Sequence, residues 1–423
     1  MQFKTPALVG LVVALMATLT PAAEPPKPAP DKAPKRVAAI VSTYFPASHA
    51  DVIIGRLLKT YTLDGKGDSP RMRLASLYTD QVPRNDISRK LAKEYGFSIH
   101  DKVEGALTLG TGKLAVDGVL LVAEHGDYPA SKTGQTVFPK RRLFEQIAKV
   151  FEASSQVVPL FIDKHLADNW DDAKSIYDTC RRLKVPLMAG SSLPVLWRYP
   201  AIDVKRGAKL KEVVAVSYHT LDAYGFHALE MVQCLAERRA GGETGIKSVQ
   251  CLVDEAVWEA GRRKVYDPDL LTAALARMKR KVPKDRPLRD QVPHPVLWVI
   301  NYADGLKASV LTLNNAVGEW SVAWREVNDQ GKASDQATLF WTQEAQPFMH
   351  FTYLLHGIDE MMQTGKPAWP AERTLLTSGT LDALLTSKLK GGATLDTPQL
   401  RFSYKVDWNW CQPPDTGLKP MPK

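Results

Sequence analysis

The sequence predicts an α/β protein in which a doubly wound parallel sheet is followed by an α+β domain with a largely antiparallel, open sheet. The first observation is that short apolar runs alternate with amphipathic helical patterns from residue 36 to about residue 200. Such alternation is typical of parallel strands joined by right-handed helical crossovers. The second observation is a change after residue 200 to strands, a hairpin and isolated helices. A chain of 423 residues is also long enough for two domains.

The first half contains apolar runs of the kind that form buried parallel strands. They lie at 36–41, 73–80, 116–129, 157–163 and 185–192. Helical patterns separate them at 47–61, 85–97, 140–154 and 169–184. In the second of these helices, Asn85 or Asp86 is expected to cap the start and Gly96 to end it. These elements predict a Rossmann-like nucleotide-binding domain over residues 36–200.

The second half has a different pattern. Strands are expected at 210–219 and 245–253, on either side of a helix at 222–240. A hairpin is expected at 296–315, with Asp304 and Gly305 at its turn, and another helix at 371–389. We therefore expect an α+β substrate and oligomerisation domain over residues 201–405, followed by a C-terminal tail over residues 406–423.

Residues 1–23 have the layout of a secretory signal peptide, with Lys4 near the start, a short apolar run and small residues before Glu24. Because the apolar run is too short for a comfortable membrane span, we expect cleavage and no stable membrane anchor. An uncleaved N-terminal anchor is the alternative. Residues 24–35 are typical of a Pro-rich linker. The expected location is the periplasm or the medium of a bacterium.

Composition excludes some classes of protein. With 44% hydrophobic and 24% charged residues, the chain is an ordinary globular protein. Its net charge of +9 comes from scattered Lys and Arg residues without a basic run, which favours a solvated surface over nucleic-acid binding. The cysteines, Cys180, Cys234, Cys251 and Cys411, form no CxxC pair, so one or two disulfides stay open and Cys180 is expected as a buried thiol.

Polar side chains follow two neighbouring strands of the predicted parallel sheet. Asp163, Lys164 and His165 end one strand, and Glu124 and His125 follow the preceding one. In open α/β sheets, ligands bind at this carboxyl edge. The histidines near strand ends or helix starts, which could share one cleft, are His49, His125, His165, His219 and His227.

These residues resemble motifs of the Gfo/Idh/MocA oxidoreductases, which include glucose–fructose oxidoreductase and inositol dehydrogenase. Asp163-Lys164-His165 stands where the family has Glu-Lys-Pro before a helix and a strand. The segment YGFHALE, residues 224–230, resembles the second-domain motif Asp-x-Gly-x-His-x-x-Asp. The resemblance covers roughly residues 36–405, and the order and spacing of the motifs carry it.

The resemblance implies an oxidoreductase that acts on a sugar or sugar derivative with NAD or NADP. His227 would be the acid/base and Lys164 would bind the reacting hydroxyl, because a His titrates near neutrality and a Lys stabilises a developing alkoxide. The implied substrate-binding residues are Asp163, His165, Asp222 and Glu230. The implied cofactor-binding residues are Ser42, Thr43, Asp80, Glu124 and His125. The resemblance also implies association through the open sheet into a homo-oligomer.

The turn after the first strand departs from the family. The glycine positions of its G-x-G-x-x-G motif hold Val41, Thr43 and Pro46. Glycines there let the backbone approach a pyrophosphate closely, and Pro46 lacks an N–H. Tyr44 and Phe45 are bulky where the family keeps the loop slim. We therefore expect weak binding of NAD(P).

Other classes of function stay open. One is a non-catalytic protein that binds a carbohydrate-like ligand after losing the dinucleotide. Another is an NAD-dependent enzyme that cleaves glycosidic bonds. A third is a metal-dependent enzyme, although no HxH or HExxH spacing occurs. Its candidate ligands are Glu124, His125, Asp127, His165 and His227.

Overall fold

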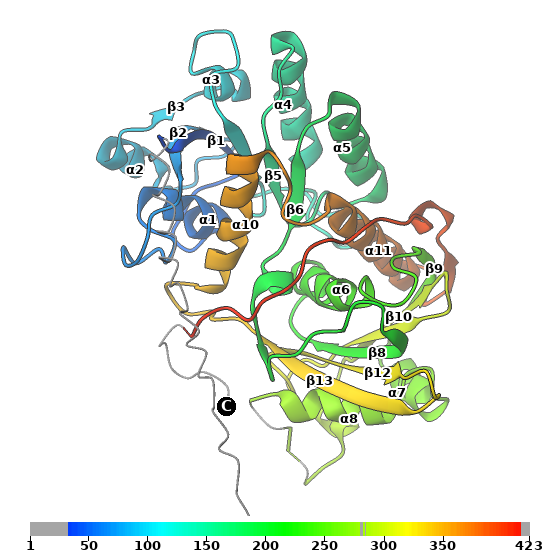
Figure 1. Ribbon diagram of the computed structural model, residues 1–423. Helices are drawn as coiled ribbons and strands as arrows, with labels where there is room; N and C mark the ends of the chain where they lie inside the picture. The colour runs from blue at the N-terminus through cyan, green and yellow to red at the C-terminus, as the bar shows by residue number, and fades with distance from the viewer. Residues whose placement is uncertain (1–32, 280–281, 284, 416–423) are drawn as a thin grey trace, which may run out of the picture. The chain divides into compact units, whose positions relative to one another are not determined.

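Two sheets with helices packed on them make up the described part of the protein (Figure 1), and the predicted fold class is confirmed. The computed structural model describes residues 33–279, 282–283 and 285–415. The expected signal peptide, residues 24–32 of the expected linker and residues 416–423 of the expected tail lie outside the described residues. Among the described residues, no helix is both long and apolar enough to cross a membrane.

The first sheet is parallel throughout, with the strand order β3-β2-β1-β4-β5-β6. Its strands are β1 (Lys35–Val41), β2 (Met72–Thr79), β3 (Ser98–Ile99), β4 (Gly118–Val122), β5 (Leu160–Asp163) and β6 (Leu187–Gly190). The chain runs outward from β1 to β3 and then returns to β4 on the other side of β1. The switch point of this doubly wound sheet therefore lies between β1 and β4, where open α/β sheets bind ligands.

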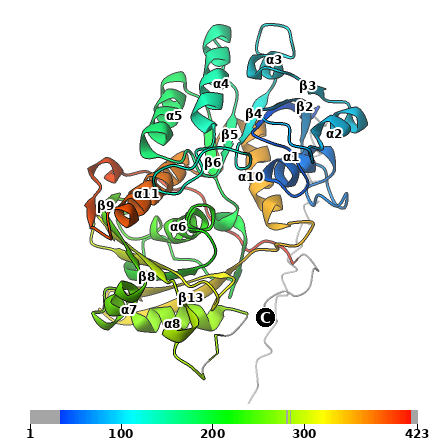
Figure 2. The ribbon, with the colours of Figure 1, turned by 180° about the vertical axis from the view of Figure 1, so that it is seen from behind.

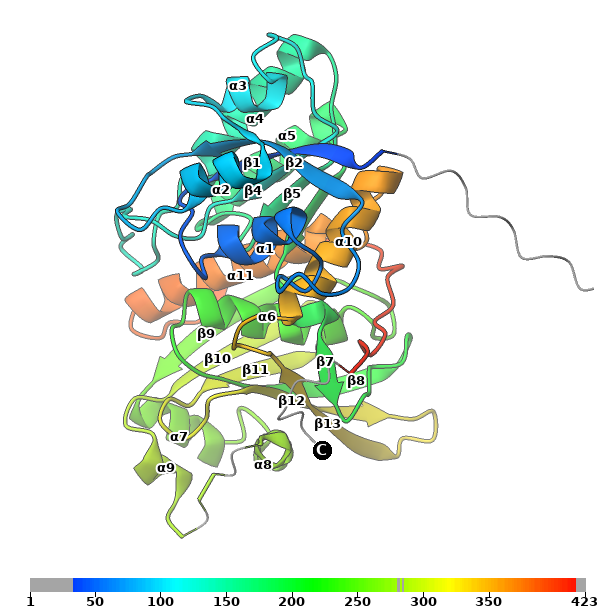
Figure 3. The same ribbon diagram turned by 90° about the vertical axis from the view of Figure 1, so that its left-hand side faces the viewer.

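Helices cover both faces of this sheet (Figure 3). They are α1 (His49–Leu58), α2 (Ser88–Tyr95), α3 (Val103–Thr108), α4 (Lys140–Ser154), α5 (Trp170–Leu183) and α10 (His350–Thr364). Side chains alternate between the faces of a strand, so Ala38 and Ile40 of β1 pack with α3, α4 and α5. Val37 and Ala39 pack on the other face with α1 and α10. One face of the first sheet is thus completed by a helix from the second half of the chain.

The second sheet is mixed and mostly antiparallel, with the order β14-β9-β10-β11-β8-β12-β13-β7. Its strands are β7 (Trp197–Tyr199), β8 (Lys209–Ser217), β9 (Ile246–Val253), β10 (Val296–Tyr302), β11 (Lys307–Thr312), β12 (Trp320–Val327), β13 (Ala333–Trp341) and β14 (Leu395–Asp396). Only β8 and β11 pair in parallel among these described strands. The predicted hairpin is present as β10 and β11, with Gly305 at a positive φ of 93° in its turn.

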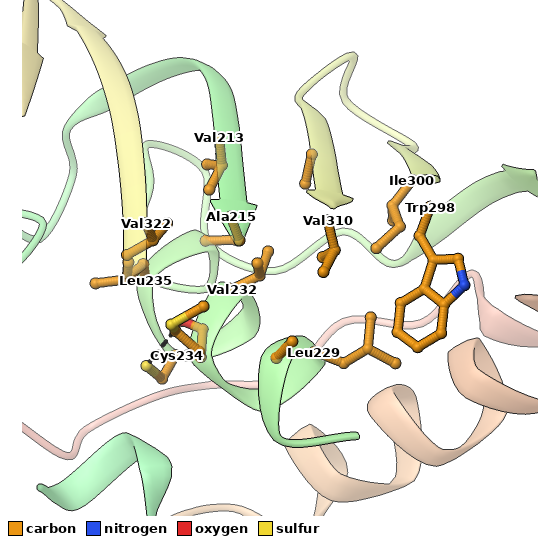
Figure 4. Close-up of a cluster of buried hydrophobic side chains, with 14 of the residues drawn as sticks. Val213, Ala215, Leu229, Val232, Cys234, Leu235, Trp298, Ile300, Val310 and Val322 are labelled. Atoms are coloured by element: carbon orange, nitrogen blue, oxygen red, sulfur yellow. Dashed lines mark hydrogen bonds between the residues drawn. The ribbon is translucent and has the colours of Figure 1, made fainter. Parts of the chain in front are cut away.

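Both faces of the second sheet are covered by the chain's own helices (Figures 1 and 2). These are α6 (Ala223–Ala236) and α11 (Ala371–Leu389) on one face, and α7 (Glu255–Arg262) and α8 (Pro268–Arg277) on the other, with the short α9 (Leu288–Gln291) after them. Figure 4 shows Leu229 and Val232 of α6 beside Ala215 and Val310 of the sheet. On the second of these faces, α7 and α8 pack on side chains of β8, β10 and β11. The expected association into a homo-oligomer stays a prediction.

Several elements were missed or bounded differently in the sequence. The hairpin β12–β13 and the helices α3, α7, α8 and α10 were not predicted. The segment 116–129 was expected to be a strand that ends in a polar loop. In the structure the strand is Gly118–Val122, and the loop follows it. Helix α2 begins at Ser88, whose N–H donates to the Asp86 carboxylate, and Gly96 ends it as predicted with a φ of 75°. All four cysteines are free thiols, and Cys180 is buried as expected.

Candidate active site

A cavity of about 740 Å³ lies at the carboxyl edge of the first sheet and reaches the second. This volume is within the usual range for small-molecule sites. Its walls come from the start of α1, the loops after β4 and β5, and α6, β12 and α10. Six predicted site residues line it: Glu124, His125, Lys164, His165, Asp222 and His227. Lys164 follows β5 and His227 lies on α6, so the two face one cavity from different layers of the fold.

Glu124 joins two buried lysines beside this cavity. Lys164 Nζ donates to Glu124 Oε2 at 2.8 Å, and Lys140 Nζ donates to Glu124 Oε1. Lys140 also donates to the backbone oxygens of Asp163 and His165, at 3.1 and 2.7 Å. Lys140 therefore holds both the carboxylate and the backbone segment that carries Lys164.

The charges of this cluster determine one another's protonation. Burial would raise the pKa of Glu124, but Lys140 and Lys164 outweigh burial and hold that pKa well below its ordinary value. Burial would lower the pKa of Lys164, yet Glu124 and Asp163 raise it. Lys164 is therefore an ammonium at neutral pH, paired on one side and facing the cavity.

His227 reaches the cavity because α6 approaches the second sheet closely at Gly225. A Cβ on Gly225 would lie 2.2 Å from the ring of Trp298, which explains the glycine. The Nδ1 atom of His227 is buried without a hydrogen-bond partner in the described structure. Burial, together with the positive charge of Lys164, lowers the pKa of His227 well below its ordinary value. His227 is therefore a neutral imidazole at neutral pH.

His165 and Asp222 connect the two layers of the fold. His165 Nε2 lies 3.0 Å from Asp222 Oδ1, and the Lys164–His165 peptide bond is cis. Burial would raise the pKa of Asp222, but the contact with His165 lowers it. Gln135 and the backbone N–H of Thr136 donate to the Asp222 carboxylate, at 3.3 and 3.4 Å. Asp222 is therefore an anion at the rim of the cavity.

His49, another histidine of the cavity, is held in place by a carboxylate. His49, at the start of α1, places Nδ1 2.5 Å from Asp163 Oδ2. Asp163 itself does not line the cavity, so it contacts His49 rather than the position of a ligand. His125 lies beside His49, with ring centroids 5.2 Å apart. Sequence reasoning had grouped these histidines but had not paired His49 with Asp163.

Aromatic side chains from α6 and β12 form one wall of the cavity. Tyr224 and Trp320 line the cavity and stack with ring centroids 5.2 Å apart. His219, which does not line the cavity, stacks on Tyr224 at 4.4 Å. Neither residue was predicted as part of the site. Trp320 belongs to the missed hairpin, and Tyr224 lies in the segment 224–230, of which only His227 and Glu230 were named as site residues. Near them, Glu344 adds a carboxylate to the lining.

Glu230, a predicted substrate-binding residue, lies outside the cavity. Its carboxylate accepts hydrogen bonds from the backbone N–H and the hydroxyl of Ser191, at 2.7 and 2.8 Å, and from Thr374 at 3.0 Å. The side chain is buried, and burial raises its pKa despite these contacts. Glu230 joins α6 to the end of β6 and to α11. Its expected contact with substrate is wrong for this structure.

The predicted cofactor residues are divided between two places. Glu124 and His125 line the cavity, whereas Ser42, Thr43 and Asp80 do not. Asp80 accepts hydrogen bonds from Tyr78, Tyr128 and Arg142, at 2.9, 2.8 and 2.6 Å.

The two bulky side chains expected in the turn after β1, Tyr44 and Phe45, pack in different places. Tyr44 is fully buried and packs in the core with α1, so it does not fill the loop. Phe45 lies against His125, with ring centroids 5.3 Å apart. Of the two bulky side chains noted in this turn, Tyr44 therefore belongs to the core.

Two histidines with lowered pKa values, His125 and His350, indicate that acid destabilises the folded protein. Burial and the neighbouring His49 lower the pKa of His125 from 6.5 to about 4, and burial lowers that of His350 to about 3. In the unfolded chain both protonate near about pH 6.5, so the unfolded state binds more protons as the pH falls below that value. The free energy of unfolding should be fully retained above about pH 6.5 and should decrease as the pH falls toward about 4.

Urea unfolding across this pH range measures the effect. His125→Gln should show a shallower loss of stability than the wild type, whereas the exposed His294→Gln should match the wild type. If the free energy of unfolding falls equally steeply with pH in the wild type and in His125→Gln, the lowered pKa of His125 does not contribute to the loss of stability.

The residues considered as metal ligands do not converge. Among the described residues, no group of three or more His, Cys, Asp or Glu side chains is arranged to hold a metal ion. Glu124 is instead paired with two lysines, and Asp127 does not line the cavity.

Comparison with known proteins gives matches in structure and none in sequence. No protein-family model and no curated protein matches the chain. GenD2 from gentamicin A biosynthesis, in complex with NAD, matches 88% of this chain and 99% of its own, at 13% identity and a TM-score of 0.54. Scyllo-inositol dehydrogenase from Lactobacillus casei, with bound NAD(H) and scyllo-inositol, matches 86% and 98%, at 10% identity and a TM-score of 0.52. A putative NADPH-dependent oxidoreductase from Desulfitobacterium hafniense matches 87% and 99%, at 14% identity and a TM-score of 0.52.

The described structure joins a Rossmann-like parallel sheet to a second, mixed sheet, and a cavity of small-molecule size lies where they meet. The fold is that of the Gfo/Idh/MocA-type oxidoreductases, as the sequence resemblance implied.

Proposed function

We propose that the protein is an oxidoreductase that acts on a sugar or sugar derivative and depends on NAD or NADP. One observation carries the proposal: Lys164 and His227 line the same cavity from different layers of the fold, the first as a cation and the second as a neutral base. This pair supplies what removal of a hydroxyl proton requires, namely a base and a positive charge for the developing alkoxide. Export to the periplasm or medium remains part of the proposal.

The lining of the cavity supports a sugar-like substrate. The stacked rings of Tyr224 and Trp320 offer an apolar face, and Asp222 and Glu344 offer carboxylates that accept hydrogen bonds from hydroxyls. A molecule with CH groups on one face and hydroxyls at its edge suits such a surface, because small-molecule sites combine apolar walls with a few placed polar groups.

The residues around the cavity fit the nicotinamide end of a dinucleotide better than its diphosphate end. At the nicotinamide end, the cavity has room beside Lys164 and His227. At the diphosphate end, the backbone N–H of Ala47 already donates to Asp51 at the start of α1. A bound nicotinamide would supply the acceptor for hydride. The chain's own residues would orient the reacting hydroxyl through Lys164 and take its proton on His227.

The test combines nucleotide analysis with a search for substrate. Calorimetric titration with NAD⁺ and NADP⁺ should give weak binding, and incubation with each nucleotide and a panel of sugars and polyols should reduce the nicotinamide. The matched control omits the sugar. Failure of every sugar to support reduction by protein saturated with nucleotide would contradict the proposal.

A second candidate is a non-catalytic protein that binds a carbohydrate-like ligand. It is favoured by the hydrogen bonds that already occupy Asp80 and the start of α1. Binding of a sugar in calorimetry, without binding of either nucleotide, would support this candidate over the first.

A further inference from the structure

The carboxyl end of the first sheet, between β2 and β4, is crossed by a segment of the chain itself. Gln81, just after β2, donates from Nε2 to the backbone oxygen of Asp127 at 2.9 Å, and the Asp127 N–H donates to Gln81 Oε1 at 2.9 Å. Tyr128 donates to Asp80 Oδ2 at 2.8 Å. Residues 125–128, called here the crossing segment, thus extend from the end of β4 to the end of β2.

The order of the strands shows which part of the sheet this contact spans. Because β1 lies between β2 and β4, the crossing segment passes over the carboxyl end of β1. In doubly wound nucleotide-binding sheets, the turn after this strand and the start of the next helix receive the pyrophosphate. The segment contacts that turn directly, since the His125 N–H donates to Ser42 Oγ at 3.4 Å.

The donors and acceptors that a dinucleotide would use are already occupied. At the start of α1, Ala47 N–H donates to Asp51 at 2.8 Å, and His49 N–H donates to His125 Nδ1 at 3.4 Å. Asp80, the acid expected to hold ribose hydroxyls, accepts from Tyr128 and Arg142. The cavity includes His125 and the start of α1 but none of Ser42, Thr43, Asp80 and Gln81.

We infer that the crossing segment occupies the place of the diphosphate and its adjoining ribose, so that Gln81 and Tyr128 determine the affinity for NAD(P). The inference rests on the proposed function. A dinucleotide binds when the segment moves aside, and the hydrogen bonds from Gln81 and Tyr128 oppose that movement. Gln81→Ala and Tyr128→Phe should therefore bind NAD⁺ and NADP⁺ more tightly than the wild type.

Calorimetric titration of the full chain with NAD⁺ and NADP⁺ tests this inference. Gln81 makes two of the hydrogen bonds, so Gln81→Ala should tighten binding about tenfold, and Tyr128→Phe about fivefold. Tyr177→Phe is the matched control, because Tyr177 also donates to a carboxylate, that of Glu372 at 2.6 Å, but lies outside the crossing segment. It should bind as the wild type does. Saturating NAD⁺ should also accelerate hydrogen exchange at the Asp127 amide of the wild type.

The outcomes separate this inference from the proposed function. If the wild type, Gln81→Ala and Tyr128→Phe bind nucleotide with the same affinity and Asp127 stays protected, the inference is overturned while the oxidoreductase proposal stands. If nucleotide binds to none of the proteins, even at millimolar concentration, both are overturned. Tighter binding by Gln81→Ala and Tyr128→Phe with an unchanged Tyr177→Phe supports the inference.

Discussion

His227→Asn should lower kcat about 10²–10⁴-fold, the usual contribution of a positioned acid or base. The imidazole is neutral because burial and the charge of Lys164 lower its pKa, and its Nδ1 atom has no partner within the described structure. Asn keeps a polar side chain of smaller size but accepts no proton at neutral pH. Affinity for the sugar should change little, since Asp222 and the aromatic wall remain. Steady-state kinetics and calorimetry on the same substrate measure both quantities.

A histidine far from the cavity provides the control. His294 is exposed and pairs with Asp254 at 3.2 Å, so His294→Asn should retain full turnover. If His227→Asn also retains turnover, the proton acceptor is another residue. The next candidate would then be His49, whose ring Asp163 holds at the edge of the same cavity.

The sheets could be predicted from the sequence because their strands are apolar runs between helical patterns. Helix α4 spans residues 140–154 as predicted, since its apolar face repeats at helical spacing. Helix α10 was missed, although it is equally regular. Its apolar residues pack on the first sheet, far away in sequence, and no local pattern indicates that partner.

Part of the candidate site could be predicted, because the carboxyl ends of neighbouring parallel strands lie at the same edge of a sheet. Lys164, His165 and Glu124 were expected together because their strands were expected to be neighbours, and all line the cavity. The role of Lys140 was not predictable, since a lysine at a helix start is usually solvated. The hydrogen bond from Tyr128 to Asp80 was missed for a related reason: it depends on the path of a loop, which hydrophobic patterning does not determine.

Lys140→Met should decrease the free energy of unfolding by about 3–5 kcal/mol, the usual cost of removing one partner from a buried ion pair. Lys140 is buried, and its ammonium is shared among Glu124 and two backbone oxygens. Without it, Glu124 loses one of its two hydrogen-bonded lysines, and the oxygens of Asp163 and His165 lose a donor. Urea unfolding at neutral pH measures the loss.

A variant of the neighbouring Arg141 serves as the control. It distinguishes the loss of a buried charge from a general effect of substitution in this turn of the helix. Arg141 pairs on the surface with Glu145 and Asp172, so Arg141→Met should change stability little. The double variant Glu124→Gln/Lys140→Met should recover part of the loss, because it no longer leaves a buried carboxylate short of a cation. A Lys140→Met protein as stable as Arg141→Met would show that the buried cluster contributes nothing to folding. In that case the position of Lys164 would have to depend on the backbone of β5 alone.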